Sequence, residues 1–107
     1  MDPSDFQAAL RALRDEYAHN LPTKLREVEE TWRTLTKTSD SEQFTLFIRL
    51  AHSLAGSGET YGFSGVTRTA RALEHYAKTM RADMPRGNGE CAEIEQLIAA
   101  LQDSAKP

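Results

Sequence analysis

The sequence FTLFIRLAHSLAGS, residues 44–57, decides the fold of this chain. Its apolar residues recur every three or four positions, which is the spacing of one face of an α-helix. With Ala51 at its centre, that face also holds Phe44, Phe47, Ile48 and Leu54. The segment ends in small residues and predicts an amphipathic helix with one side in a core.

The same period recurs in further blocks before and after this helix, and no strand-like alternation persists. Residues 6–35 are periodic on both sides of Pro22, so we expect one long helix, kinked near this proline because it lacks a backbone N–H. Two later blocks cover residues 66–80 and 94–101. The pattern predicts an all-α protein, an antiparallel up-down four-helix bundle that forms a single domain over residues 1–107.

Local signals suggest where these helices start. Pro3-Ser4 is a plausible cap for the first helix, Ser39 with Glu42 fits a capping box, and Ser64 is a candidate cap further on. The segment Met84-Pro-Arg-Gly-Asn-Gly89 predicts the loop before the last helix. Phe6, Leu10 and Leu13 lie at helical spacing in the first block.

Composition excludes several classes of function. The chain has 107 residues, a net charge of −3 and 27% charged residues of interleaved sign, unlike the basic surface of a nucleic-acid binder. No apolar run approaches the roughly 20 residues that cross a bilayer, and the N-terminus lacks a signal pattern. A single cysteine, Cys91, fits a reducing compartment, and we expect no metal site. We therefore expect a cytoplasmic monomer without membrane insertion or nucleic-acid binding.

His52 is the residue that the second helix singles out. It falls about 100° from Ala51 on the helical wheel, at the margin between core and solvent. The residues one turn on, Ala55 and Gly56, are too small to shield the imidazole. Glycine inside a helix costs about 0.5–1 kcal/mol, so Gly56 and Gly58 indicate either a docking surface, a close helix–helix approach or the helix end. An ordinary boundary histidine is the competing interpretation.

The stretch AHSLAGSGETYGF, continuing to TARALE, resembles the histidine-containing phosphotransfer (HPt) domain, including the P1 domain of chemotaxis kinases. The family pattern is His-x-Leu-Lys-Gly, a later glycine, and a Leu-Glu pair on the next helix. The matching residues here are His52, Leu54, Gly56, Gly62, Leu73 and Glu74. The segment LPTKLREVEETW is similar to the first long helix of bacterial HPt modules, so the resemblance covers about residues 6–80.

The resemblance implies that Nε2 of His52 is the phosphoacceptor and that Glu74 orients the ring through Nδ1. The alternative for Glu74 is a surface ion pair with Lys78 or Arg71. Ala55 departs from the pattern, because the family usually has a phosphoryl-binding lysine there.

Two arginines are candidates to replace that lysine. Arg71 lies one turn before Glu74, and Arg49 lies one turn before His52; a guanidinium binds phosphoryl oxygens bidentately. Solvated surface arginines are the other interpretation, which we prefer for Arg49. The partner-docking surface implied by the resemblance consists of Arg49, Ala55, Gly56, Glu59 and Arg68.

The implied function is a phosphorelay carrier that accepts a phosphoryl group on His52 and transfers it to or from a receiver-domain aspartate. A histidine kinase is the other expected partner, and the receiver would supply Mg²⁺. The sequence has no P-loop, so we expect no nucleotide site and no independent enzyme. The alternatives are a phosphotransfer-deficient module that regulates a receiver or kinase by binding only and, more distantly, a plain helical dimerisation domain.

Overall fold

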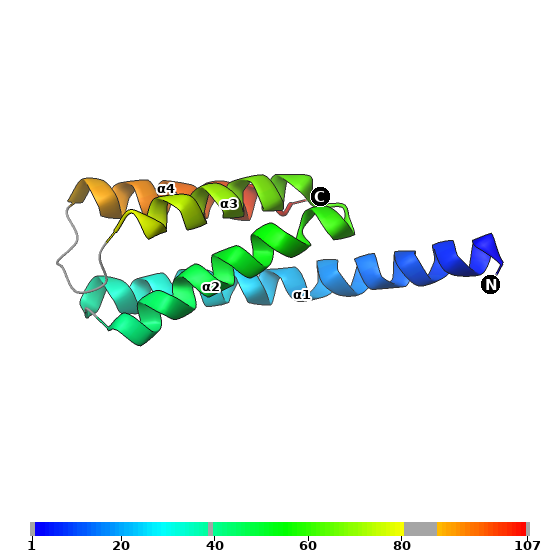
Figure 1. The fold of residues 1–107 in the computed structure, drawn as a ribbon, viewed down its shortest axis with the longest axis horizontal. Coiled ribbons are helices and arrows are strands. Elements are labelled where there is room, and N and C mark those ends of the chain that lie inside the picture. Colours follow the sequence, from blue (N-terminus) through cyan, green and yellow to red (C-terminus); the bar gives the residue numbers. More distant parts are fainter. Residues whose placement is uncertain (1, 39, 81–87, 107) are drawn as a thin grey trace.

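The computed structural model describes residues 2–38, 40–80 and 88–106. Its elements, in chain order, are the helix α1 (Pro3–Lys37), α2 (Ser41–Ser57), the short 3-10 turn η1 (Glu59–Tyr61), α3 (Ser64–Lys78) and α4 (Asn88–Ser104). Each helix packs beside two others, α1 against α2 and α4, and α3 against the same two (Figure 1). These described parts contain no strand, and the predicted all-α four-helix bundle is confirmed.

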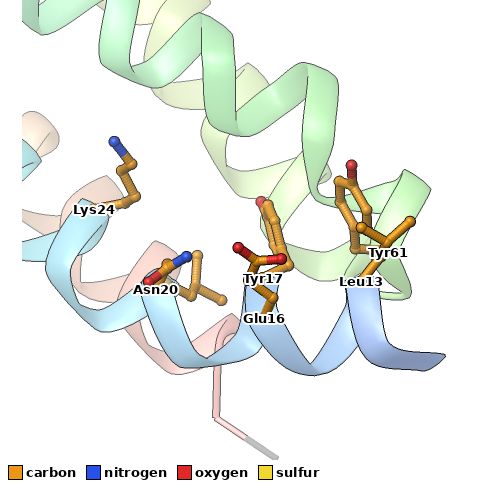
Figure 2. Close-up of a pocket in the computed structure, with 7 residues that line it drawn as sticks. Leu13, Glu16, Tyr17, Asn20, Lys24 and Tyr61 are labelled. Carbon is orange, nitrogen blue, oxygen red and sulfur yellow. The ribbon is translucent and has the colours of Figure 1, made fainter. Parts of the chain in front are cut away.

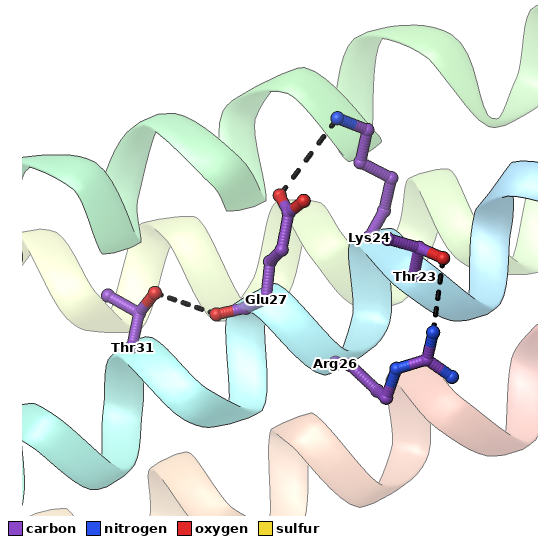
Figure 3. Close-up of polar contacts among 5 residues, drawn as sticks. All are labelled: Thr23, Lys24, Arg26, Glu27 and Thr31. Atoms are coloured by element: carbon purple, nitrogen blue, oxygen red, sulfur yellow. Dashed lines mark hydrogen bonds and ion pairs between the residues drawn. The ribbon is translucent and has the colours of Figure 1, made fainter.

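Helix α1 is one continuous helix that runs through Pro22, so the prediction of a single long helix is confirmed, and the kink near Pro22 stays a prediction. A proline inside a helix has no backbone N–H and therefore removes one hydrogen bond of the helix. Side-chain hydrogen bonds in the turns after Pro22 add to the backbone bonds that remain. Arg26 Nη2 donates to Thr23 Oγ1 at 3.2 Å, and Thr31 Oγ1 donates to the carbonyl of Glu27 at 2.7 Å (Figure 3). These local bonds link successive turns of α1 after Pro22, the first on its exposed side and the second where the helix is part-buried.

All four helices contribute to the core. The largest fully buried side chains are Val28, Leu35, Phe47, Val66, Leu73, Ile94 and Leu101. Trp32 packs against Phe47 with ring centroids 5.6 Å apart, which joins α1 to α2. At the α1–α4 contact, Gln102 Nε2 donates to Glu29 Oε2 at 2.7 Å. Burial of these apolar side chains supplies most of the stability that the fold has.

The N-terminal part of α1 lies outside this core. Figure 1 shows that the first turns of α1 extend past the end of the bundle. Further along, Tyr17 already meets the rest of the chain, because its ring stacks on Tyr61 of η1 (Figure 2) and its hydroxyl shares a hydrogen bond with Ser57 Oγ of α2. Leu21 is the first buried residue of α1, whereas Phe6 is 59% exposed and Leu13 is 49% exposed. We call residues 3–20 the α1 arm.

A tight turn between α2 and α3 sets how these two helices face each other. The carbonyl of Gly58 accepts from Phe63 N–H at 2.8 Å, and Glu59 N–H donates to Thr67 Oγ1 at 2.7 Å. A Cβ on Gly58 would lie 2.8 Å from the Phe63 carbonyl oxygen and 2.9 Å from the Thr67 nitrogen. Gly62 has φ = 90°, the left-handed region that favours glycine. The close approach of backbone to backbone therefore holds the end of α2 against the start of α3.

The helix starts differ from the sequence predictions. Asp40 caps α2, because its Oδ1 accepts from the N–H groups of Glu42 and Gln43, so the predicted capping box is wrong. A carboxylate is also the better partner for the positive end of a helix dipole. Ser39 itself is outside the described residues. At the other starts, Asp2 caps α1, and Ser64 is already the first residue of α3.

The predicted loop Met84–Gly89 can be compared only in part. Residues 81–87 are outside the described ranges, and α4 begins at Asn88, so Gly89 is helical and not part of a loop. Leu97, which was expected inside, is half-buried. Across the described ranges of the chain, no helix has the length and apolarity that a bilayer crossing requires.

Candidate functional site

The structure places a hydrogen bond between α2 and α3 at the predicted site. Nδ1 of His52 lies 2.8 Å from Oε2 of Glu74. The imidazole is largely in solvent, with 74% of the side chain exposed, whereas only 9% of the Glu74 side chain is exposed. The pair thus consists of a buried carboxylate and an accessible ring.

Glu74 stays ionised in this setting. Burial raises its pKa, but hydrogen bonds from Lys78 and His52, together with the charges of these residues, outweigh burial and leave the pKa below its usual value. An ionised carboxylate only accepts hydrogen bonds, so Nδ1 of His52 carries the proton that points at Glu74. In the neutral ring, the lone pair is then on Nε2, at the far edge of the imidazole.

Lys78 is a third member of the site. Its Nζ lies 3.0 Å from the same oxygen, Oε2 of Glu74, one turn further along α3. The sequence offered the pairing with Lys78 as an alternative to the pairing with His52, but the structure contains both contacts. The i,i+4 spacing was the available signal, although spacing alone does not show that one oxygen receives both donors.

A model of the Hpt domain family matches residues 5–104, a range that extends over all four helices except the first two residues of α1. The chain belongs to the Hpt domain family. A comparison with curated proteins found no match, and neither did a comparison with solved structures. Hpt domains take part in histidine phosphotransfer in two-component signalling, as phosphocarrier modules that interact with kinases and receiver domains. The specific likeness to the chemotaxis P1 domain stays a prediction.

Three arginines were predicted near the Hpt site, and they lie in different settings. Arg71 is exposed one turn before Glu74, and Arg49 is exposed one turn before His52. Neither has an ion-pair partner within residues 2–38, 40–80 and 88–106, so both guanidinium groups are available to an anion. Arg68 instead has its Nη2 3.8 Å from where a Cβ on Gly65 would be, on the side of α3 that faces Ser104.

Ala55, the position of the usual Hpt lysine, is not on the surface. It is 6% exposed and belongs to the core cluster, so its predicted place on the docking surface is wrong. The reason is visible in the sequence, because Ala55 lies one turn after Ala51 and only about 40° from the centre of the apolar face. A lysine at 55 would have to extend from a buried Cβ to reach a phosphoryl group.

Gly56, by contrast, is exposed, and a Cβ built there meets nothing within 4 Å. The proposed close helix–helix approach is therefore wrong for Gly56 and correct for Gly58. Gly56 leaves the surface beside His52 low and open. Glu59 is exposed in η1, beyond the end of α2.

Proposed function

We propose that this Hpt domain is a phosphorelay carrier in which Nε2 of His52 accepts a phosphoryl group and later transfers it to a receiver aspartate. The observation that carries the proposal is the 2.8 Å bond between Nδ1 of His52 and buried Oε2 of Glu74, with the ring itself 74% exposed. One nitrogen is thereby held by the protein, and the other is accessible to a folded partner.

The chemistry follows from this arrangement. The lone pair of Nε2 attacks phosphorus of a receiver aspartyl phosphate, and the bond from phosphorus to the aspartate oxygen breaks as the carboxylate leaves with its electron pair. The ring becomes positively charged while it keeps the proton on Nδ1. Ionised Glu74 stabilises that charge, and Lys78 keeps Glu74 ionised. Transfer in the reverse direction uses the same contacts, and we expect the receiver to hold the Mg²⁺.

The exposed cations around His52 support an anionic partner. Arg71, Arg49 and Lys78 lie within one turn of Glu74 or His52 on the exposed sides of α3 and α2. We propose that Arg71 contacts the phosphoryl oxygens, because it has no competing carboxylate among the described residues. Arg49, Gly56 and Glu59 are proposed to line the surface that the receiver covers, with Arg68 at its edge.

A second candidate function is a binding-only module that has lost phosphotransfer. The observation that favours it is the buried alanine at position 55, where the family pattern has lysine. Such a module would bind a receiver or a kinase through the same exposed surface and regulate it sterically.

Transfer of label distinguishes the two. Purified protein is mixed with receiver domains that have been phosphorylated with radiolabelled acetyl phosphate, or with histidine kinases and radiolabelled ATP. A carrier becomes labelled, and the label is labile in acid but stable in alkali, as expected of phosphohistidine. Complex formation in a titration with these partners, without any label on the chain, would instead establish the binding-only function.

Replacing Glu74 with glutamine is expected to slow phosphorylation about tenfold, which corresponds to about 1.4 kcal/mol in the barrier. The amide has nearly the same shape but lacks the negative charge that stabilises the charged ring. The measurement is the initial rate of labelling at a fixed concentration of phosphorylated receiver.

Glu30→Gln on the exposed side of α1 is the matched control, because it makes the same change away from the site. Both variants should retain the helical circular dichroism of the parent. An unchanged rate in Glu74→Gln would remove the positioning role of this carboxylate.

A further inference from the structure

Lys78 and His52 contact the same oxygen of Glu74. The distance to Oε2 is 2.8 Å from Nδ1 of His52 and 3.0 Å from Nζ of Lys78. Of these three side chains only that of Glu74 is buried, and 58% of the Lys78 side chain is exposed. Two donors on different helices therefore meet at one buried acceptor.

This sharing weakens the hold of Glu74 on the imidazole. The carboxylate attracts the proton on Nδ1, whereas the ammonium of Lys78 draws on the same oxygen and repels a positively charged ring. An ammonium keeps its charge throughout the neutral pH range. The Nδ1 proton is therefore held less firmly than it would be by a carboxylate that is bonded to His52 alone.

The Nδ1 proton decides how readily phosphohistidine loses its phosphoryl group. When water attacks phosphorus, the bond from phosphorus to Nε2 breaks, and its electron pair stays on Nε2 while inorganic phosphate is released. A ring that keeps the Nδ1 proton leaves as neutral imidazole. A ring without that proton would have to leave as an anion, which is a much poorer leaving group. A group that loosens the proton thus prolongs the phosphorylated state.

From the shared oxygen we propose that Lys78 is a positioning residue that prolongs the phosphorylated state of His52 by acting through Glu74. The inference rests on the proposed function, because it concerns the phosphorylated form of the same histidine. The lysine beside the site is thus on α3 in this chain, whereas the position of the family lysine on α2 is the buried Ala55.

Other charged groups near the site do not share this contact. Arg71 and His75 are exposed on α3, and Arg49 is exposed on α2. None of the three makes an ion pair or a hydrogen bond with Glu74. Helix α4 also packs on α3, but its described residues make no such contact with this carboxylate either. In the described part of the chain, Lys78 is therefore the cation through which the charge of Glu74 is shared.

Replacing Lys78 with glutamine is expected to shorten the lifetime of the phosphorylated chain about threefold near neutral pH, an effect of the size of one exposed ion pair. The pH at which the phosphorylated ring loses its Nδ1 proton should rise by about half a unit, which is the same factor. Glu74 remains ionised from about pH 6 upwards without Lys78, because the usual pKa of a glutamate is about 4.3 and the ring still donates to it. Lys78 is the last residue of α3 and exposed, so circular dichroism should show the parent fold.

Chemical phosphorylation makes the test independent of partner proteins. Phosphoramidate transfers its phosphoryl group to an accessible imidazole, with ammonia as the leaving group. Every chain therefore carries His19→Gln and His75→Gln, which leave His52 as its one histidine. After the reagent is removed, phosphorus NMR follows both the loss of phosphohistidine and the protonation of its ring from about pH 6 to about pH 9.

Three variants are compared in this background. Lys78→Gln should show the shorter lifetime and the higher pH midpoint, and Lys78→Arg should restore both, because a guanidinium can donate to the same oxygen. Lys106→Gln is the matched control without effect, since it removes the lysine of a different exposed ion pair, with Asp103. An unchanged lifetime in Lys78→Gln would overturn the inference.

A double variant shows whether Lys78 acts through Glu74. In a Glu74→Gln chain there is no carboxylate charge to share, so adding Lys78→Gln should no longer shorten the lifetime. An effect that persists there would place Lys78 directly on the phosphoryl group and refute the positioning role. Failure of phosphorylated receivers to label the chain would contradict the proposed function instead, and that result does not enter this comparison.

Discussion

Replacing His52 with glutamine is expected to abolish phosphorylation of the chain, with label reduced to background. The amide nitrogen of glutamine has no free lone pair with which to attack phosphorus, because that pair is delocalised. Glutamine still offers an N–H to Glu74, and 74% of the His52 side chain is exposed, so the fold should not change. The measurement is the label on the chain after incubation with phosphorylated receiver, together with its helical circular dichroism.

The chain supplies two matched controls, since it has two other histidines. His75 follows Glu74 directly and is exposed on α3, and His19 is exposed on the α1 arm. His75→Gln and His19→Gln should both keep the label of the parent. Label that persists in His52→Gln and disappears in His75→Gln would move the phosphoacceptor to α3 and refute the assignment.

Gly58→Ala is expected to destabilise the domain by about 2–3 kcal/mol, which is a factor of roughly 30–150 in the unfolding equilibrium. The φ of −56° at Gly58 suits alanine, so the backbone conformation itself costs nothing. The cost arises because the new Cβ would lie under 3.0 Å from two backbone atoms, at Phe63 and Thr67, which cannot move without opening the turn. Urea unfolding followed by circular dichroism gives the free energy of unfolding.

Gly56→Ala is the matched comparison, two residues earlier on the same helix. Its Cβ meets open space, and alanine lowers the entropy of the unfolded chain, so we expect stabilisation by about 0.5–1 kcal/mol. The two substitutions add the same methyl group with opposite expected signs. Equal effects would show that Gly58 is not the point of close approach between α2 and α3.

Several features were predictable from the sequence because they depend on residues close together in the chain. The periods of three and four along residues 44–57 and the later blocks predicted the helices and the bundle. They also put His52 at the edge of the apolar face. The same wheel could have shown that Ala55 is buried. The exact caps were less predictable, because Ser39 and Asp40 are both good capping residues and only the start of α2 decides between them.

The partnership of Glu74 with His52 came from the resemblance to the Hpt family and could not have come from periodicity. The two residues are 22 positions apart, and their contact depends on how α2 lies against α3. The turn at Gly58 determines that register through backbone contacts with Phe63 and Thr67. The Lys78 contact is local to α3, at i,i+4 spacing, and only the packed structure shows that one oxygen of Glu74 is bonded to both Lys78 and His52.

By itself, then, the sequence determined four amphipathic helices and an accessible His52, because hydrophobic spacing acts within each helix. Only the tertiary structure decided that Glu74 meets this histidine while it is also bonded to Lys78. The tertiary structure also decided that Ala55 is inside, and that the face of Phe6, Leu10 and Leu13 is left uncovered. The physical reason is that spacing marks which side of a helix is apolar, whereas the lengths and registers of neighbouring helices decide which parts of that side they cover.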